Sequence, residues 1–310
     1  MDSPTASTPA PPPTTHAPGA PGAPVPGSGR ERVTVPAVRA RKRRDGADPI
    51  VMVTAYDEPG ARIADGAGVD VILVGDSVAN NVLGYDDTLH VTIDDMARHT
   101  AAVGRARPRA LVLGDLPWMS YHLTVEEAVA SAAALVRAGA GAVKLEGGPA
   151  RARVIGAIVD AEIPVMGHLG LTPQSVLAMG GYRVQGRDVD AARALVDAAR
   201  RLEEAGCFAV VLEGVPDVVA AEITARLSIP TIGIGAGPHC DGQVLVFHDL
   251  LGLGAGPVPK FVRPYANLAE VATAAVAAYA ADVRAGAFPG DAETYHGSPE
   301  LRAALGPAPG

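Results

Sequence analysis

The sequence predicts an α/β fold, a single (β/α)8 TIM barrel, on the basis of three observations. Short aliphatic runs recur along the chain and are near-continuous, as in parallel strands covered on both faces. Ala-rich amphipathic segments separate most of these runs. The strand-helix repeats extend over about 250 residues, the usual size of such a barrel. An open doubly wound sheet is the alternative, but no G-x-G-x-x-G follows the first run.

The expected elements alternate in order. Thr124 and Glu127 form the sequence signature of a capping box at the start of one helix. Gly139 and Gly206 stand where a helix terminus favours a left-handed residue. We expect strands at 51–55, 71–75, 110–114, 142–145, 164–167, 209–212 and 230–234. We expect helices at 58–68, 92–106, 124–138, 150–161, 189–205 and 216–227.

The eighth repeat is ambiguous. The run QVLVFH at 243–248 could be a strand, but Asp241 is a good N-cap and Gly252 a good terminator. We therefore predict a helix at 242–251, the eighth strand at 260–263 and a last helix at 267–284.

Three regions differ in composition. Residues 1–35 are rich in Pro and Ala and are predicted to be a disordered N-terminal extension. Residues 36–288 are predicted to form the catalytic barrel, and residues 289–310 are predicted to be a flexible C-terminal tail. The basic run at 39–44 is interpreted as a solvated helix face that leads into the first strand.

Overall composition excludes several classes of protein. The net charge of -8 argues against nucleic acid as a partner, since that role requires a basic surface. No apolar run approaches the roughly 20 residues of a membrane helix, and the N-terminus lacks a signal-peptide pattern. The two cysteines have no metal-binding spacing. These features predict a cytoplasmic protein without a membrane partner.

Charged and polar residues lie where the predicted strands end, which is where TIM barrels place their chemistry. A single strand-end Asp is more often a helix N-cap, but glutamate is a poor N-cap and the set as a whole needs another explanation. Lys144 and Glu146 are two residues apart and point the same way; a structural Lys-Glu pair explains them equally well. The candidates are Asp76, Ser77, Asp115, Lys144, Glu146, His168 and Glu213.

Converging carboxylates repel one another, so a cation is expected among them. Oxygen ligands without a His or Cys cluster favour a hard ion, Mg²⁺ or Mn²⁺. Asp76, Asp115 and Glu146 end adjacent strands and can face one ion. Glu213 lies across the barrel mouth, where an acid or base would act. Long glycine-containing loops at 78–88 and 169–188 are expected to cover this face.

Several stretches carry a specific resemblance. They are TAYD at 54–57, VGDS at 74–77, GDLPWMSY at 114–121, VKLEGG at 143–148, GHLGLTPQS at 167–175, GGYRVQGRD at 180–188, IPTIGIGAG at 229–237, CDGQVLVFHDLLGL at 240–253 and PKFVRPY at 259–265. Together, over about 36–290, they resemble the ketopantoate hydroxymethyltransferase (3-methyl-2-oxobutanoate hydroxymethyltransferase) family.

The resemblance implies a barrel of the phosphoenolpyruvate/ketopantoate type with one Mg²⁺ per subunit, assembled as a homodecamer, a pentamer of dimers. It implies hydroxymethyl transfer from 5,10-methylenetetrahydrofolate to 3-methyl-2-oxobutanoate, giving 2-dehydropantoate for pantothenate and coenzyme A synthesis. Glu213 matches the proton acceptor. Asp76, Asp115 and Glu146 match the metal site, and the substrate contacts are Asp76, Ser77, Asp115, Lys144 and His168.

The sequence departs from the family pattern at Trp118, where phenylalanine is common, and at Gly214, where a larger residue is often found.

Two alternative functions are consistent with a barrel of this kind. One is the phosphoenolpyruvate mutase and isocitrate lyase group, against which GHLGLTPQS argues. The other is a non-catalytic barrel, which the loss of an acid would favour; none is lost.

Overall fold

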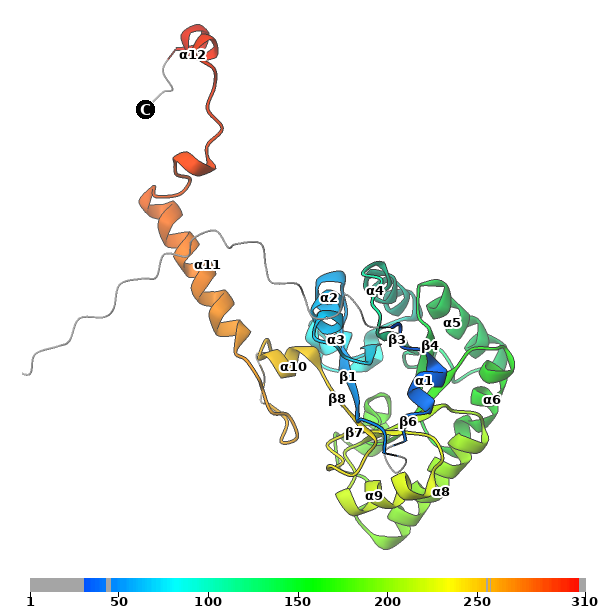
Figure 1. Cartoon of the computed structure of the whole chain (residues 1–310). Coiled ribbons are helices and arrows are strands. Elements are labelled where there is room, and N and C mark those ends of the chain that lie inside the picture. The colour runs from blue at the N-terminus through cyan, green and yellow to red at the C-terminus, as the bar shows by residue number, and fades with distance from the viewer. Residues whose placement is uncertain (1–30, 43–45, 255, 257, 307–310) are drawn as a thin grey trace, which may run out of the picture.

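Eight parallel strands close into a barrel in sequence order, with β8 paired back onto β1 (Figure 1). The structure is a computed structural model that describes residues 31–42, 46–254, 256 and 258–306. This topology confirms the predicted fold class. The strands are β1 (Ile50–Thr54), β2 (Val71–Val74), β3 (Leu111–Asp115), β4 (Ala142–Glu146), β5 (Val165–Gly170), β6 (Ala209–Glu213), β7 (Thr231–Ile234) and β8 (Gly242–Leu245).

Helices surround most of the barrel, and several begin at side-chain caps. Thr124 and Glu127 form the predicted capping box of α5, and Thr92 with Asp95 forms another on α4. The helices are α1 (Val35–Arg39), α2 (Glu58–Gly66), α3 (Val78–Asn81), α4 (Ile93–Arg105), α5 (Val125–Arg137), α6 (Ala152–Asp160), α7 (Val176–Met179), α8 (Val189–Glu204), α9 (Asp217–Arg226), α10 (Phe247–Leu251), α11 (Leu268–Ala285) and α12 (Pro299–Leu305).

The predicted order of the eighth repeat is wrong. Residues 242–245 form β8, which pairs with both β1 and β7, and residues 260–263 are not a strand. The helical spacing is confined to α10, which starts at Phe247 and ends at the left-handed Gly252. Asp241 does not cap a helix but bonds Thr231 and Lys42 at the strand starts. The hydrogen bonds that residues 242–245 form with β1 and β7 therefore determine their structure, in spite of the local helix signals.

Side chains alternate between the two faces of each strand, so every second residue points into the barrel. The inward set forms a separate apolar cluster that includes Leu113, Met166, Val211 and Ile232. Val38 of α1 is fully buried in the same cluster and closes the N-terminal end. Apolar side chains thus fill the barrel interior from its N-terminal end, and polar side chains occupy the C-terminal end.

The segment before β1 is more ordered than expected. The Val33 N–H donates to the Arg109 carbonyl, and Val33 and Val35 pack on the inward cluster. Over residues 39–42, the described part of the basic run, the predicted solvated helix face is wrong, because α1 ends at Arg39 and Lys42 is buried; residues 43 and 44 lie outside the described residues. The predicted extension at 1–30 lies outside the described residues. Within the predicted C-terminal tail, residues 299–305 form α12.

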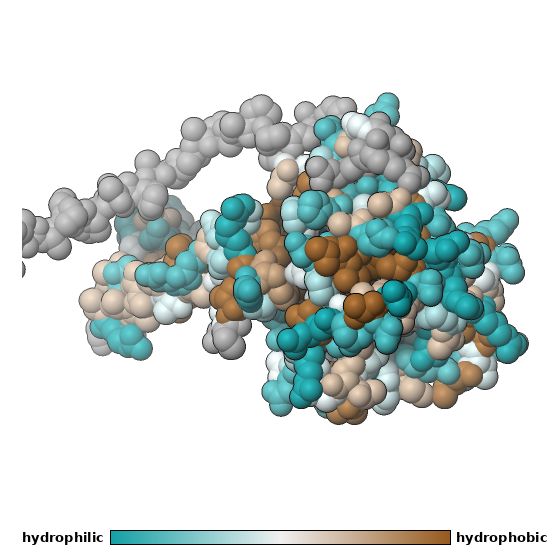
Figure 2. Space-filling model, turned by 90° about the horizontal axis from the view of Figure 1, so that it is seen from below, coloured by the Kyte–Doolittle hydropathy of each residue, from teal (hydrophilic) through white to brown (hydrophobic). Residues whose placement is uncertain are grey.

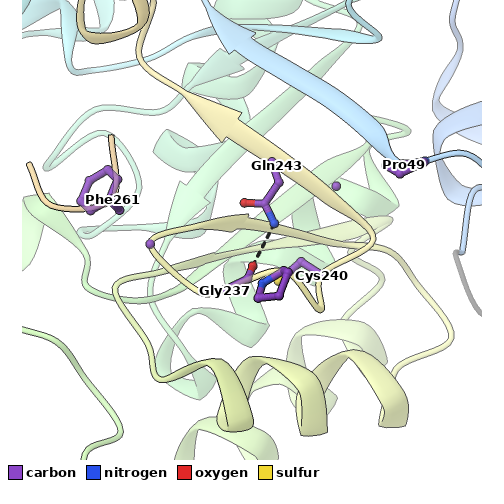
Figure 3. Close-up of a pocket in the computed structure, with 8 residues that line it drawn as sticks. Pro49, Gly237, Cys240, Gln243 and Phe261 are labelled. Atoms are coloured by element: carbon purple, nitrogen blue, oxygen red, sulfur yellow. Dashed lines mark hydrogen bonds between the residues drawn. The ribbon is translucent and has the colours of Figure 1, made fainter. Parts of the chain in front are cut away.

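The outer wall of the barrel lacks a helix between β7 and β8. A hollow of about 560 Å³ opens there, bordered by Pro49, Cys240 and Phe261 (Figure 3). Gln243 points outward on β8 and donates a hydrogen bond to the Gly237 carbonyl (3.0 Å). This hollow is on the side of the barrel, away from the strand-end acids.

Helix α11 projects from the ring of helices instead of covering that wall (Figure 1). None of its residues is buried. The lobe at the left of Figure 2, which corresponds to this C-terminal arm, carries both apolar and hydrophilic residues. Exposed large apolar side chains on α11 are Leu268, Val271, Val276, Tyr279 and Val283. Of the described helices, none combines the length and apolar character needed to cross a bilayer.

Candidate active site at the carboxyl ends of the strands

Strand alternation places a row of charged side chains at the barrel mouth. On β4, Ala142 points into the apolar interior, so Lys144 and Glu146 point inward above it. The same alternation on β3, β5 and β6 turns the last inward residues toward the mouth. The register sets Asp115 beside Lys144 and Glu146 beside His168. Glu213 follows on β6, opposite Gly170 of β5.

Lys144 lies at the centre of this row. Its Nζ is 2.8 Å from Asp115 Oδ1 and 3.9 Å from Glu146 Oε1, and all three side chains are buried. Burial alone would lower the pKa of the Lys144 ammonium, but the surrounding carboxylates, chiefly Asp115, outweigh burial and raise it. Burial raises the pKa of the Asp115 carboxyl, while Lys144 opposes that rise. Lys144 is therefore held as a cation.

Asp76 joins the cluster from the loop after β2. It is buried, and its backbone N–H donates to Asp115 Oδ2 (3.2 Å). Burial, reinforced by the negative charges of Asp115 and Glu146, raises the pKa of the Asp76 carboxyl well above its usual value. The site therefore holds more buried carboxylate than one lysine can neutralise.

His168 connects the acids of two strands. Its Nδ1 is 3.4 Å from Glu146 Oε1, and its Nε2 is 3.3 Å from Glu213 Oε2. Burial and Lys144 would lower the pKa of the imidazole, but the two glutamates outweigh them and raise it to about 9. Burial would raise the pKa of Glu146, but His168 and Lys144 hold it below its usual value. The imidazole thus fixes where the Glu213 carboxylate stands.

Ser77 lies at the edge of the cluster. Its Oγ is 2.9 Å from the Tyr56 hydroxyl, which in turn accepts a hydrogen bond from Thr54 Oγ1 (3.0 Å). The Ser77 side chain is half-buried, whereas Tyr56 is buried. Burial raises the pKa of the Tyr56 hydroxyl, so it remains a neutral donor. Ser77 is therefore positioned as a hydrogen-bonding group at the rim.

Two residues that the sequence pattern does not reveal, Gln174 and Tyr121, join the acids together. Gln174 Nε2 donates to Asp76 Oδ2 (2.9 Å), and its backbone N–H donates to Glu146 Oε2 (3.0 Å). The Tyr121 hydroxyl donates to Gln174 Oε1 (2.6 Å) and accepts from the Glu146 N–H (3.2 Å). Both residues lie in motifs singled out above, but periodicity does not place neutral loop residues. The loop containing Gln174 thus seals one side of the site.

Both ends of the 169–188 loop are tied to the end of β6. The Leu171 N–H donates to the Glu213 carbonyl (2.8 Å), and the Gln185 N–H donates to the Gly214 carbonyl (2.9 Å). Gly214 has φ +54, and an added Cβ would lie 3.2 Å from the Leu171 Cβ. Glycine at this departure from the family pattern therefore fits a tight loop crossing, and it removes no polar group from the site.

The donor chemistry of the site fits a hard divalent cation, although its geometry is not preassembled. Within the described ranges, no three His, Cys, Asp or Glu side chains stand close enough together to hold a metal ion. However, Asp76, Asp115 and Glu146 offer carboxylate oxygens alone, and together with Glu213 they outnumber the two cations beside them, Lys144 and His168. A bound cation would relieve that excess, so the residues suit Mg²⁺ as ligands directly or through water.

Comparison with known sequences gives a consistent result. The family model described as ketopantoate hydroxymethyltransferase matches residues 32–291. A 3-methyl-2-oxobutanoate hydroxymethyltransferase of Methylobacterium sp. (strain 4-46) is 58% identical over 267 residues, covering 86% of this chain and 91% of the relative. A second, from Bradyrhizobium diazoefficiens, is 54% identical over 275 residues, covering 89% and 93%.

Solved structures with the same fold are more distant in sequence. A 2,3-dimethylmalate lyase of the PEP mutase/isocitrate lyase superfamily aligns with a TM-score of 0.55 and 18% identity, covering 87% of this chain and 93% of the other. A phosphonopyruvate hydrolase aligns with a TM-score of 0.56 and 15% identity, covering 87% and 94%. At these identities the likeness shows the barrel fold alone.

Proposed function

Because the chain belongs to the ketopantoate hydroxymethyltransferase family, we propose that this transferase moves a hydroxymethyl group from 5,10-methylenetetrahydrofolate to 3-methyl-2-oxobutanoate. The product is 2-dehydropantoate, a precursor of pantothenate and coenzyme A. One observation carries the proposal: the buried ammonium of Lys144 lies among carboxylates at the mouth of the barrel. This arrangement suits a small anionic 2-oxo acid.

The chain's own residues divide the binding of the 2-oxo acid between them. Asp76, Asp115 and Glu146 would hold one Mg²⁺, which supplies Lewis-acid stabilisation of a developing enolate. Lys144 offsets the charge of the substrate carboxylate. Ser77 offers its hydroxyl to the substrate, and its contact with Tyr56 orients that hydroxyl.

Glu213 is the proposed proton acceptor. Its side chain is 16% exposed, whereas the side chain of His168 is 3% exposed, so Glu213 reaches the open space of the mouth. The contact with His168 fixes one carboxylate oxygen and leaves the other for the proton beside the substrate carbonyl. The carbon that loses this proton bonds to the methylene carbon of the folate, and the two C–N bonds of that methylene break. Water supplies the hydroxyl group, and the second water hydrogen and the proton held by Glu213 pass to the two folate nitrogens, so that tetrahydrofolate leaves. His168 acts here as a positioning and substrate-contact residue.

The proposal includes a homo-oligomer, specifically a decamer built as a pentamer of dimers. Exposed apolar residues on α11 support self-association, because a helix with one unburied apolar face gains stability from a partner. We also propose a cytoplasmic location. In its support, Cys207 and Cys240 are both buried thiols that form no disulfide.

Solvent exchange tests the proposed chemistry directly. The protein is incubated with 3-methyl-2-oxobutanoate in deuterated water, with and without Mg²⁺, and loss of the proton beside the carbonyl is followed by NMR. We expect Mg²⁺-dependent exchange, and 2-dehydropantoate when methylenetetrahydrofolate is added. Absence of both exchange and product would overturn the proposal.

Two variants test the assigned roles. Glu213→Gln removes the proton acceptor with little change in shape, so substrate binding should persist while exchange slows by roughly 10²–10⁴-fold. Asp115→Ala should abolish the dependence on Mg²⁺. Glu222→Gln, on the outer face of α9, is the matched control. Near-normal exchange in Glu213→Gln would remove Glu213 from its role.

A further inference from the structure

A second pocket lies beside the acid site, between the loops that follow β3 and β4. Its cavity of about 370 Å³ is bordered by Tyr121, His122 and Thr124 on one side and by Arg151 and Arg153 on the other. This volume is within the range of pockets that hold small organic ligands. None of these residues is among the acids described above, so the pocket has a separate use.

Tyr121 forms a wall shared by the pocket and the acid site. Its hydroxyl bonds Gln174 and Glu146 on the inner side. Its ring lies 5.7 Å from Arg151 Cζ and 4.2 Å from the centroid of His122. A ligand seated against the arginines therefore stands next to the reacting centre.

The pocket is built to receive an anion. Neither Arg151 nor Arg153 forms an ion pair with any residue in the described part of the chain. An added Cβ at Gly147 would lie 2.9 Å from Arg151 Cγ, so this glycine lets the arginine stem pack against the backbone. One carboxylate, that of the exposed Glu126, also borders the pocket.

His122 adds a neutral donor to the same pocket. Its Nδ1 accepts a hydrogen bond from the Met119 N–H (3.2 Å), which leaves Nε2 to carry the ring proton. Burial, assisted by Arg151, lowers the pKa of His122 to about 4, so the ring stays neutral. Met119 has φ 68, a strained conformation that this contact helps to hold.

Apolar side chains of the same loop stand at the surface. Trp118 and Met119 are each 39% exposed, and Leu123 is 66% exposed. A ligand with a flat ring system and an anionic end would contact both surfaces. The reduced folate of the proposed reaction has that chemistry, because its aromatic portion ends in a glutamyl group with two carboxylates.

We propose that this pocket binds the glutamyl carboxylates of the folate co-substrate through Arg151 and Arg153, with the aromatic portion lying on the loop of Trp118. This inference rests on the proposed function. It assigns the co-substrate a subsite distinct from the 2-oxo acid site, with Tyr121 as the boundary between them.

Kinetics with a truncated co-substrate test the subsite. Wild type and Arg151→Ala/Arg153→Ala are compared with 5,10-methylenetetrahydrofolate and with the matching tetrahydropteroate, which lacks the glutamyl group. We expect wild type to favour the folate by about tenfold in KM, from two partly exposed charge-assisted contacts. The double variant should lose this preference with kcat little changed. Arg151→Lys should restore part of it, since charge returns without the planar fork.

Matched measurements separate this idea from the proposed function. Arg193→Ala, at an exposed arginine on α8, should keep the wild-type preference. Proton exchange of 3-methyl-2-oxobutanoate requires no folate, so its KM in the double variant reports on the acid site alone. A rise in that KM matching the rise for folate would assign the arginines to the 2-oxo acid and overturn the subsite. So would an unchanged preference for the glutamyl group.

Direct binding gives a result even if turnover is absent. Trp118 is the sole tryptophan of the sequence, so its fluorescence reports on ligands at this loop. We expect p-aminobenzoylglutamate to quench it with an affinity about tenfold higher than p-aminobenzamide, and the difference to vanish in the double variant. Equal affinities in wild type would refute the subsite. Absence of exchange in wild type would instead refute the proposed function.

Discussion

Two of the three lysines in the sequence are buried, at opposite ends of the same barrel. Lys42 closes the N-terminal end, where its Nζ is 2.7 Å from Asp241 Oδ2 and donates to the Ile229 carbonyl (3.1 Å). Lys144 stands at the C-terminal end, 2.8 Å from Asp115 Oδ1. The contacts are almost identical in length and burial, yet their surroundings differ.

Charge balance distinguishes the two ends. Asp241 also accepts hydrogen bonds from the N–H and hydroxyl of Thr231, so the carboxylate that faces Lys42 is well bonded. Lys144 instead faces carboxylates that outnumber it, and burial with those neighbours raises the pKa of Asp76. A buried ion pair whose carboxylate is well hydrogen-bonded serves a structural role. An excess of buried carboxylates is instead typical of a site that binds a ligand.

The largest expected effect is on activity at the C-terminal end. Lys144→Met removes the cation that faces the substrate carboxylate, so kcat/KM for proton exchange should fall on the order of a thousandfold, the scale of losing one partner of a buried charge pair. Exchange kinetics on the folded fraction measure this. Lys42→Met, the matched variant at the other end, should retain the wild-type value per folded molecule. Equal losses in both variants would remove the distinction between the ends.

The next effect is on stability, and we expect it at the N-terminal end of the barrel, where Lys42 lies. Lys42→Met removes a buried cation that lies 2.7 Å from Asp241 and should lower the free energy of unfolding by about 3–5 kcal/mol. Urea unfolding monitored by circular dichroism measures the midpoint, with an unchanged slope as the check on two-state behaviour. Lys260→Met, at the exposed third lysine, should leave the midpoint in place. A wild-type midpoint for Lys42→Met would show that the pair does not stabilise the barrel.

The contrast also shows what the sequence could predict of the fold. Aliphatic runs with helical segments between them gave the barrel and seven strands, because burial on both faces leaves a clear local pattern. The eighth strand was assigned wrongly because Asp241 and Gly252 look like helix signals. Asp241 serves Lys42 instead, and that contact joins residues 199 apart in sequence. Contacts between residues far apart in the sequence leave no local pattern. The structural role of Lys42 could therefore not be predicted either.

For the candidate site, strand ends and alternation were enough to bring together Asp115, Lys144 and Glu146. The same logic fails for Gln174, whose side chain reaches Asp76 from a long loop. Loop residues follow no period, and a neutral amide gives no charge signal. The family resemblance supplied the roles of the acids, and geometry added the residues that hold them.

A smaller effect is expected when the excess charge is reduced. Asp76→Asn removes one of the crowded carboxylates and can keep an oxygen facing Gln174 Nε2. Without Mg²⁺, we expect this variant to be more stable by about 1 kcal/mol, the scale of relief at a strained functional site. Thermal unfolding in EDTA measures the gain, and proton exchange should be strongly impaired in parallel. A loss of stability in EDTA would show that the carboxylates are not in excess.

The smallest effect concerns the two thiols near the N-terminal end, Cys207 before β6 and Cys240 before β8. Burial raises the pKa of Cys207 to about 12 and also raises that of Cys240, so at pH 8 the folded protein presents almost no thiolate. Reaction with a disulfide reagent then requires local opening of this end. Lys42→Met should speed labelling about tenfold, whereas Lys144→Met should not. Labelling in urea, where both thiols are exposed, is the control; equal native rates in the two variants would mean that the ends open together.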